Sequence, residues 1–420
     1  MEKIIVRGGR KLQGEVDISI AKNSVLPIIV ATILNPTEII LKKVPMLEDV
    51  TVLINLLREL NCEVQFSSIT GDLKINTLNL KEVDPNSELI RKMRASFLVM
   101  GPMLARFGRC KISMPGGCNI GSRPVDLHLK GFKSLGIESE IGYGYVEAKV
   151  DKLHGNRIYL DFPSVGATEN IMMAAILAPG ITIIENAAEE PEIWDLARFL
   201  NSMGAKIEGA GYGKITIHGV SQLKQPEPFT PIFDRIEAGT FMVAAGITNS
   251  KITINGVNEE HLMPTIEKLK ECGVYCSIDG QKMIVDGTQE KKPVDIKTMP
   301  YPGFPTDMQA QIMALLSITR GVSVITETVF ENRFMHVGEL GRMGANIKID
   351  GRIAIVEGVS TLTGCEVKAT DLRAGAAMIL AGLVANGETE IGEVYHIDRG
   401  YTNIEEKFKK LGAEIYRLHK

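Results

Sequence analysis

The order of apolar and polar residues repeats along the chain with a period of about seventy residues. A helix with one apolar face, then a glycine, then an alternating strand recurs in FKSLGIESEI, FLNSMGAKIEG, KLKECGVYCSI, LGRMGANIKI and FKKLGAEIYRL. The glycines are Gly136, Gly204, Gly273, Gly344 and Gly412, which lie 68, 69, 71 and 68 residues apart. Glycine tolerates the left-handed conformation that closes many helices. The pattern therefore predicts five copies of one helix–strand unit.

An earlier segment, LLRELNCEVQF, carries Asn61 at the same place, 75 residues before Gly136. Asparagine is the other residue that tolerates this conformation, so the segment fits as a sixth copy.

Each copy also contains a second helix that is more apolar and richer in alanine. Five examples, each followed by a β-branched strand, are NSVLPIIVATIL, ATENIMMAAILAPG, IEAGTFMVAAG, DMQAQIMALLSITRG and LRAGAAMILAGLVANG. Helices that are apolar all round are buried, whereas helices with a polar face lie outside. We therefore expect an α/β protein built from βαβαββ units with buried inner helices.

The sixth unit ends at AEIYRLHK without a closing strand, and KIIVRG at Lys3–Gly8 has the pattern of the missing piece. The N-terminus is thus expected to complete the last unit. Three units would form each of two similar domains, with the proline-bearing QLKQPEPFTPIF as one crossing. The predicted domains are 1–20 with 230–420, and 21–229 inserted between them, with ligands bound in the cleft between the domains.

Composition narrows the class of protein. A net charge of −4 over 420 residues gives no general attraction to nucleic acid or to anionic membranes. The longest uncharged apolar run, Ala374–Ala385, is shorter than the roughly 18 residues of a membrane span. The first thirty residues lack a signal-peptide pattern, and the six cysteines have neither disulfide nor zinc spacing. We expect a cytoplasmic monomer without metal or organic cofactor.

Polar and charged residues gather at the start of the inner helices. They are Lys22, Asn23, Ser164, Asp234, Arg235, Asp307, Asp371 and Arg373, with Arg91 and Arg94 slightly later in the second copy. Helix capping alone, worth about 1 kcal/mol for each residue, would explain any one of Ser164, Asp234, Asp307 and Asp371.

A second group lies between each middle strand and outer helix, namely Cys118, Arg123, Glu190, Arg333 and Arg399. A lone arginine near a strand end is usually solvated. An arginine beside a buried helix, however, usually holds a carboxylate or a phosphate, and helix N-termini add positive charge. Together the two groups predict a cleft for a polyanionic ligand.

Cys118 differs from the other cysteines because it follows Pro115, Gly116 and Gly117 in a loop, in MPGGCNIGSRPVDLH. A nearby cation, Arg123, and a helix N-terminus would lower the pKa of the thiol and make it a usable acid or nucleophile. The glycines would let the loop, about residues 113–124, move as a lid. The alternative is an incidental surface cysteine.

Several stretches together resemble the UDP-N-acetylglucosamine enolpyruvyl transferases: PGGCNIGSRPVDLH, PTDMQAQ, TETVFENRFMH, ATDLRA and YHIDRGY. The resemblance covers essentially the whole chain. It implies an inside-out α/β barrel of two domains, each with three βαβαββ units. It also implies transfer of the enolpyruvyl group of phosphoenolpyruvate to the 3-hydroxyl of UDP-N-acetylglucosamine with release of phosphate, the first committed step of peptidoglycan synthesis.

The resemblance assigns roles residue by residue. Cys118 would be the reactive cysteine and the target of fosfomycin, and Asp307 the general base. Phosphoenolpyruvate would lie among Lys22, Asn23, Arg123, Arg333, Arg373 and Arg399, of which Lys22 and Arg399 would also act in catalysis. The nucleotide sugar would contact Asn23, Arg94, Arg123, Pro124, Val125, Asp126, Leu127, Ser164, Val165, Gly166, Asp307 and Val329. Some relatives have lysine in the loop before SVG, but this chain has DFPSVGAT, which leaves a charged diphosphate contact there in doubt.

Two alternatives stay open at this stage. The enolpyruvyl transferase of the shikimate pathway has a similar repeat and reaction but lacks the cysteine loop. A non-catalytic six-unit ring that binds nucleic acid would need a basic inner surface, which the net charge and the 5% of aromatic residues disfavour.

Overall fold

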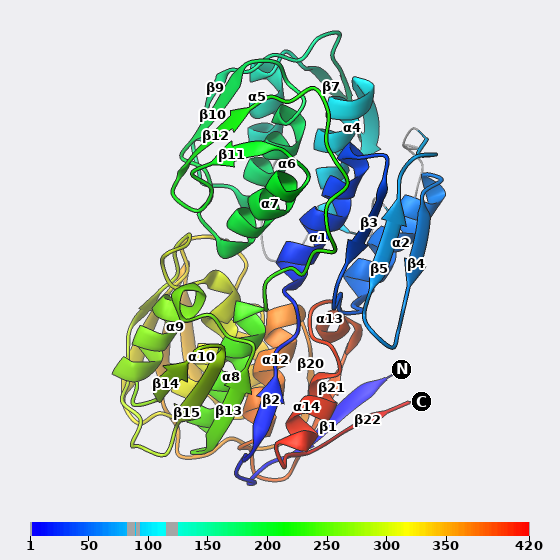
Figure 1. Ribbon diagram of the computed structural model, residues 1–420. Coiled ribbons are helices and arrows are strands. Elements are labelled where there is room, and N and C mark those ends of the chain that lie inside the picture. Colours follow the sequence, from blue (N-terminus) through cyan, green and yellow to red (C-terminus); the bar gives the residue numbers. More distant parts are fainter. Residues whose placement is uncertain (1, 82–88, 90–92, 115–124, 420) are drawn as a thin grey trace. The chain divides into compact units, whose positions relative to one another are not determined.

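The computed structural model describes residues 2–81, 89, 93–114 and 125–419. The chain divides into two compact units, which we call the discontinuous unit (residues up to Ser19 and from Phe233 onward) and the inserted unit (the described residues from Ile20 to Ile232). Figure 1 labels many of their helices and strands.

In the inserted unit the strands form three sheets. The first has β3 (Glu38–Leu41), β5 (Leu73–Asn76) and β4 (Glu63–Phe66); the second has β6 (Arg109–Ser113), β8 (Tyr145–Lys149) and β7 (Glu138–Gly142); the third has β11 (Lys206–Glu208), β12 (Lys214–His218), β10 (Ile181–Glu185) and β9 (Arg157–Tyr159). The inner helices are α1 (Lys22–Ala31) with η1 (Thr32–Leu34), η2 (Arg94–Val99) with α4 (Met100–Phe107), and α6 (Val165–Ala175). The outer helices are α2 (Glu48–Glu59), α5 (Asp126–Ser134) and α7 (Pro191–Ser202).

The discontinuous unit has three sheets of four strands. They are β14 (Tyr275–Asp279), β15 (Lys282–Asp286), β13 (Lys251–Asn255) and β2 (Glu15–Asp17); β16 (Ile296–Lys297), β17 (Val322–Thr326), β19 (Ile353–Glu357) and β18 (Asn346–Asp350); and β20 (Glu366–Lys368), β21 (Glu388–Gly392), β1 (Lys3–Arg7) and β22 (Glu414–Leu418). The inner helices are α8 (Arg235–Ile247), η3 (Thr306–Met308) with α10 (Gln309–Leu316), and α12 (Leu372–Gly382). The outer helices are α9 (Glu259–Glu271), α11 (Val337–Arg342), α13 (Tyr395–Asp398) and α14 (Ile404–Lys410).

The turns that close the outer helices confirm the repeat. The five glycines have φ between 90° and 97°, and Asn61 has φ 66° (the glycines are Gly136, Gly204, Gly273, Gly344 and Gly412). All six residues are therefore in the left-handed conformation that glycine and asparagine tolerate best.

The first strand of the chain completes the last sheet, as predicted. β1 lies between β21 and β22 and is antiparallel to both, with Ile4 opposite Ile391 and Val6 opposite Ile415. β2 then pairs in parallel with β13. The ends of the chain therefore belong to one unit.

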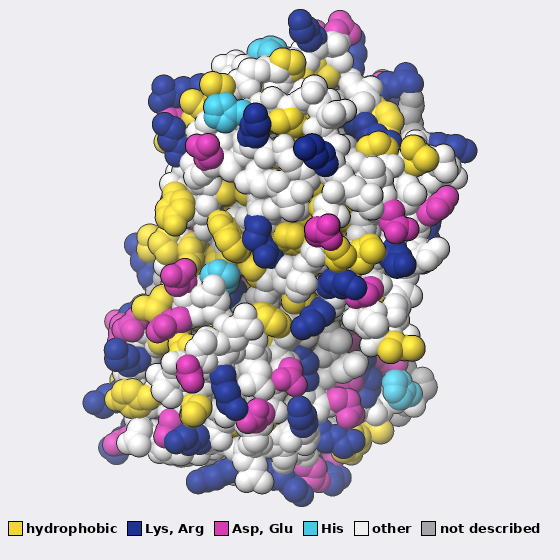
Figure 2. Space-filling model, viewed as in Figure 1, with side chains coloured by type: hydrophobic (Ala, Val, Ile, Leu, Met, Phe, Trp, Pro, Cys, Tyr) yellow, Lys and Arg dark blue, Asp and Glu magenta, His cyan; other side chains and the backbone are white. Residues whose placement is uncertain are grey.

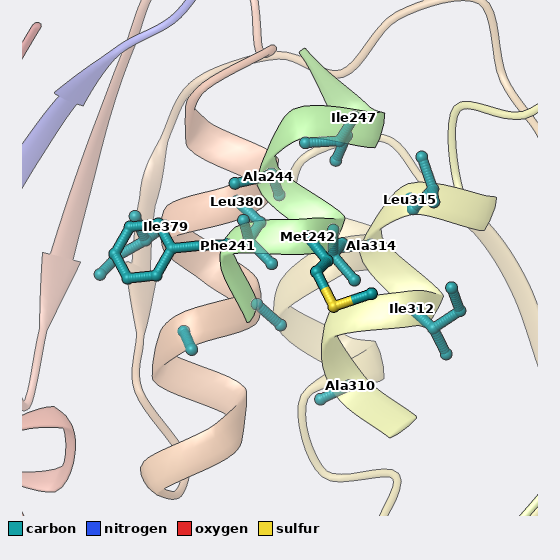
Figure 3. Packing of buried hydrophobic residues seen from close by; sticks show 14 of the residues in the cluster. Phe241, Met242, Ala244, Ile247, Ala310, Ile312, Ala314, Leu315, Ile379 and Leu380 are labelled. Carbon is teal, nitrogen blue, oxygen red and sulfur yellow. The ribbon is translucent and has the colours of Figure 1, made fainter. Parts of the chain in front are cut away.

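The inner helices of the discontinuous unit form its core. α8, α10 and α12 pack on one another through Phe241, Ile312, Leu315, Ile379 and other apolar side chains (Figure 3). All eight residues of α10 are buried, so this helix has no face exposed to solvent. The chain packs so closely around Gly239 of α8 that an added Cβ would lie 2.8 Å from the Met308 sulfur.

Charges on the surface are mixed. On the face shown in Figure 2, Lys and Arg side chains lie among Asp and Glu side chains rather than in a patch of one sign. Within the described part of the chain, no helix is long and apolar enough to cross a membrane.

Candidate functional site

In the discontinuous unit, the carboxylate of Asp307 lies between two buried guanidinium groups. Arg333 Nη2 is 2.9 Å from Asp307 Oδ1, and Arg373 Nε and Nη2 are 3.1 and 2.9 Å from Oδ2. The arginine side chains are only 4% and 3% exposed, whereas that of Asp307 is 27% exposed. The sequence separations are 26 and 66 residues. The fold therefore brings together three of the residues predicted for the site.

Asp307 does not cap a helix, so the capping interpretation of this residue is wrong. Asp234 accepts hydrogen bonds from the backbone N–H groups of Ile236 and Glu237, and Asp371 does the same for α12. In the copy of the repeat that contains α10, the chain enters this helix through the 3₁₀ turn η3 at the equivalent place. No side chain caps η3 or α10. The carboxylate of Asp307 is thus available to the arginines.

A cluster of buried polar side chains contacts Arg373 and Asp307. The Tyr401 hydroxyl is 2.9 Å from Thr240 Oγ1 and 3.3 Å from Gln311 Nε2, and Gln311 Nε2 donates to the Asp307 carbonyl at 2.8 Å. The Arg373 guanidinium lies 5.4 Å from the centre of the Tyr401 ring. Burial opposes the charge of Arg373, but nearby acidic groups, with Asp307 first among them, outweigh it and raise the pKa of Arg373. The guanidinium therefore stays charged.

Two histidines lie near Asp371, at the start of α12. Burial lowers the pKa of His336 to about 4, with Arg333 adding to the effect and the Asp371 carboxylate opposing it. Burial and then Arg399 lower the pKa of His396, again against Asp371. Arg399, predicted to bind substrate, follows the last residue of α13 and lies close enough to His396 to affect its pKa.

The pKa of His336 predicts an acid-dependent loss of stability. Its folded-state value lies below the ordinary 6.5, so the neutral ring contributes stability above pH 6.5 that is lost as the pH falls toward 4. The free energy of unfolding should therefore fall by about 3 kcal/mol more in the wild type than in His336→Gln between these pH values. Urea unfolding of both proteins at pH 4, 5, 6 and 7 measures it, and parallel curves would contradict the expectation.

The loop that carries Arg333 is shaped by a buried glutamate. Glu327, 1% exposed, accepts hydrogen bonds from the backbone N–H groups of Val329 and Phe330 and from the Thr298 and Thr306 hydroxyls. Val329, predicted to contact the nucleotide sugar, is half-buried in this loop.

In the inserted unit, Lys22 is the first residue of α1, and its ammonium lies 3.1 Å from Asp49 Oδ2 in the first turn of α2. Both side chains are largely buried, at 11% and 6% exposure. Asn23 follows on α1 and is exposed. Sequence reasoning missed Asp49; an acidic residue at the start of an outer helix looks like an ordinary favourable charge near a helix N-terminus.

Two other predicted segments of the inserted unit lie beside each other. Ser164 caps α6 by accepting a hydrogen bond from Ala167 N, and an added Cβ at Gly166 would lie 3.4 Å from the His128 ring. His128 is on α5, one residue after Leu127, and its Nδ1 is 3.1 Å from Asn170 Nδ2 of α6. Val125–Leu127 and Ser164–Gly166 are therefore neighbouring helix starts.

A buried acidic group was also missed. Glu169 of α6 is 4% exposed, and burial, followed by the charges of Glu192 and Glu190, raises its pKa well above the ordinary value. Its position inside the apolar stretch ATENIMMAA was the available signal.

Cys118, Arg123 and Pro124 lie outside the described residues, and so does the side chain of Arg94. Among the residues that are described, no group of three His, Cys, Asp or Glu side chains could hold a metal ion.

Comparison with known proteins decides the family. The family model of EPSP synthase (3-phosphoshikimate 1-carboxyvinyltransferase) matches residues 6–408. The chain is 65% identical over its full length to UDP-N-acetylglucosamine 1-carboxyvinyltransferase 2 of Clostridium tetani and 63% identical to UDP-N-acetylglucosamine 1-carboxyvinyltransferase 1 of Clostridium acetobutylicum, with 100% of both relatives covered. The chain belongs to the enolpyruvyl transferase family. Members of this family are transferases.

Solved structures of other enolpyruvyl transferases share the fold. An enolpyruvyl transferase from Streptomyces tendae is 23% identical, with a TM-score of 0.88 and coverage of 99% of this chain and 98% of that one. EPSP synthase from Acinetobacter baumannii is 19% identical, with a TM-score of 0.77 and full coverage of both chains. The predicted fold class is thus confirmed, with the strands in separate sheets of three or four.

Proposed function

We propose that this chain transfers the enolpyruvyl group of phosphoenolpyruvate to the 3-hydroxyl of UDP-N-acetylglucosamine and releases phosphate. The observation that carries the proposal is the Arg333–Asp307–Arg373 cluster, which places a partly exposed carboxylate between two buried cations. Such a cluster offers both a base for a hydroxyl and cations for an anionic substrate. Relatives at 56–65% identity over their full or nearly full length bear this activity in their names.

The chemistry needs one base, one acid and several fixed cations. Asp307 would accept the proton of the attacking 3-hydroxyl, while Cys118 would deliver a proton to the methylene carbon of phosphoenolpyruvate. The tetrahedral adduct would then lose a proton from its methyl group and phosphate, which forms the enol ether of the product. Lys22, Arg123 and Arg399 would neutralise the phosphate, and Arg333 and Arg373 would contribute further positive charge.

The acceptor would be held by helix starts and loops. We assign it to Asn23, Arg94, Arg123–Leu127, Ser164–Gly166, Asp307 and Val329. Backbone N–H groups at helix N-termini suit a diphosphate, and two of these segments are neighbouring helix starts. We also propose that the two compact units are the two domains of the enzyme, and that it acts in the cytoplasm as a monomer in peptidoglycan synthesis, with Cys118 as the target of fosfomycin.

Phosphate release tests the proposal. Release from phosphoenolpyruvate should depend on UDP-N-acetylglucosamine and should be severely impaired in Cys118→Ala and Asp307→Ala. Shikimate 3-phosphate in place of the nucleotide sugar should give no release above background. Release with shikimate 3-phosphate alone would overturn the assignment in favour of the other branch of the family.

A further inference from the structure

We infer that Arg333 and Arg373 keep Asp307 from acting as a base until an anionic substrate group draws a guanidinium away from it. The inference rests on the proposed function and adds a coupling to it: the base becomes available only once phosphoenolpyruvate is bound.

The contacts of Asp307 carry the first step. Each of its two oxygens accepts from a different arginine, at 2.9 Å on one side and at 2.9 and 3.1 Å on the other. Both arginines are almost fully buried, so water screens these contacts little. Two charge-assisted contacts favour the ionised carboxylate and oppose its taking up a proton. In this arrangement Asp307 is a poor base.

A second observation indicates that an anion is the group that loosens the contacts between Asp307 and the arginines. Arg373 uses Nε and Nη2 for Asp307, while its Nη1 is buried and has no hydrogen-bond partner among the described residues. A buried guanidinium nitrogen without an acceptor is unfavourable, and a carboxylate or phosphate is its preferred partner. The structure thus leaves one side of Arg373 ready for an anion.

The surroundings limit how the arginine can respond. Tyr401 lies against the guanidinium, and Gln311 ties the Tyr401 hydroxyl to the Asp307 carbonyl. These contacts fix the backbone of Asp307 and the ring of Tyr401. When an anion binds, the contacts that change are therefore those between the Asp307 carboxylate and the arginines. A substrate anion and Asp307 then compete for the same two cations.

Competition predicts an unusual variant. Asp307→Asn removes the competing charge, so it should bind phosphoenolpyruvate about tenfold more tightly or better, although it has lost the base. The matched control is Asp234→Asn: Asp234 also acts electrostatically on Arg373, but its side chain caps α8 and has no contact with the guanidinium among those described. Asparagine still caps a helix, and this variant should change the affinity by less than about threefold.

Isothermal titration calorimetry with phosphoenolpyruvate, in proteins that also carry Cys118→Ala to prevent a covalent adduct, measures these affinities. Unchanged or weaker binding by Asp307→Asn, or equal tightening in both variants, would overturn the inference. If acceptor-dependent phosphate release by the wild type is normal, that result leaves the proposed function intact; absence of release from the wild type overturns the proposed function itself.

If Asp307→Asn fails to fold, a second measurement can be made on the wild-type protein. In a chain labelled with ¹³C at the aspartate carboxyl groups, the Asp307 resonance, assigned with Asp307→Glu, should shift on saturation with phosphoenolpyruvate, while that of Asp279 on an exposed hairpin should not. An Asp307 resonance that stays in place at saturation would also overturn the inference.

Discussion

Asp307→Asn should lower acceptor-dependent phosphate release by roughly 10²- to 10⁴-fold, the range expected on removal of a general base. The amide keeps the size of the side chain but cannot take the proton of the attacking hydroxyl. The affinity for phosphoenolpyruvate should move in the opposite direction, so the loss should appear in kcat rather than in KM for that substrate. Steady-state kinetics with each substrate varied in turn separates these effects.

Stability must be measured beside the rate. The substitution leaves two buried guanidinium groups without their shared carboxylate, and breaking a buried ion pair in this way costs about 3–5 kcal/mol. Thermal unfolding will show whether the variant is folded at the assay temperature. Asp279→Asn, on the exposed end of β14, is the control and should change stability by less than about 0.5 kcal/mol and leave the rate unaltered. A folded Asp307→Asn protein with the wild-type rate would remove Asp307 from the role of base.

The architecture could be predicted because its determinants are local. A helix that must end in a left-handed residue requires glycine or asparagine at that position, and five glycines and Asn61 mark the six turns. The strand Lys3–Arg7 could be placed in the last sheet because its apolar alternation matches the closing strands of the other units.

The site was harder to predict, because equivalent positions in the repeat have different uses. Asp234, Asp307 and Asp371 all precede an inner helix, and nothing local distinguishes them in the sequence. Two of the three cap their helices, whereas the 3₁₀ turn before α10 directs Asp307 to two arginines distant in the chain. The pairing of Lys22 with Asp49 also has no local signal in the sequence, since only the packing of α1 against α2 brings the two residues together.

Lys22→Ala should be the second most damaging change, because Lys22 is placed to act both in binding and in the fold. If its ammonium neutralises charge that develops on the phosphate, its removal should lower phosphate release by roughly 10²- to 10³-fold. It also removes the cation that lies 3.1 Å from the buried Asp49, which should lower the free energy of unfolding by up to about 3–5 kcal/mol. Phosphate release and urea unfolding report the two effects separately.

The chain contains a closely matched control in Lys42→Ala. Lys42 and Asp72 form the same type of pair in the same unit, with 2.7 Å between Nζ and Oδ2, but the lysine side chain is 39% exposed rather than 11%. Exposed pairs contribute about 0–1 kcal/mol, so this variant should be nearly as stable as the wild type and fully active. Because residue type and pair geometry are similar, any difference between the variants reflects burial and position at the start of the inner helix. If Lys22→Ala behaved like Lys42→Ala in both measurements, Lys22 would have neither a catalytic nor a structural role.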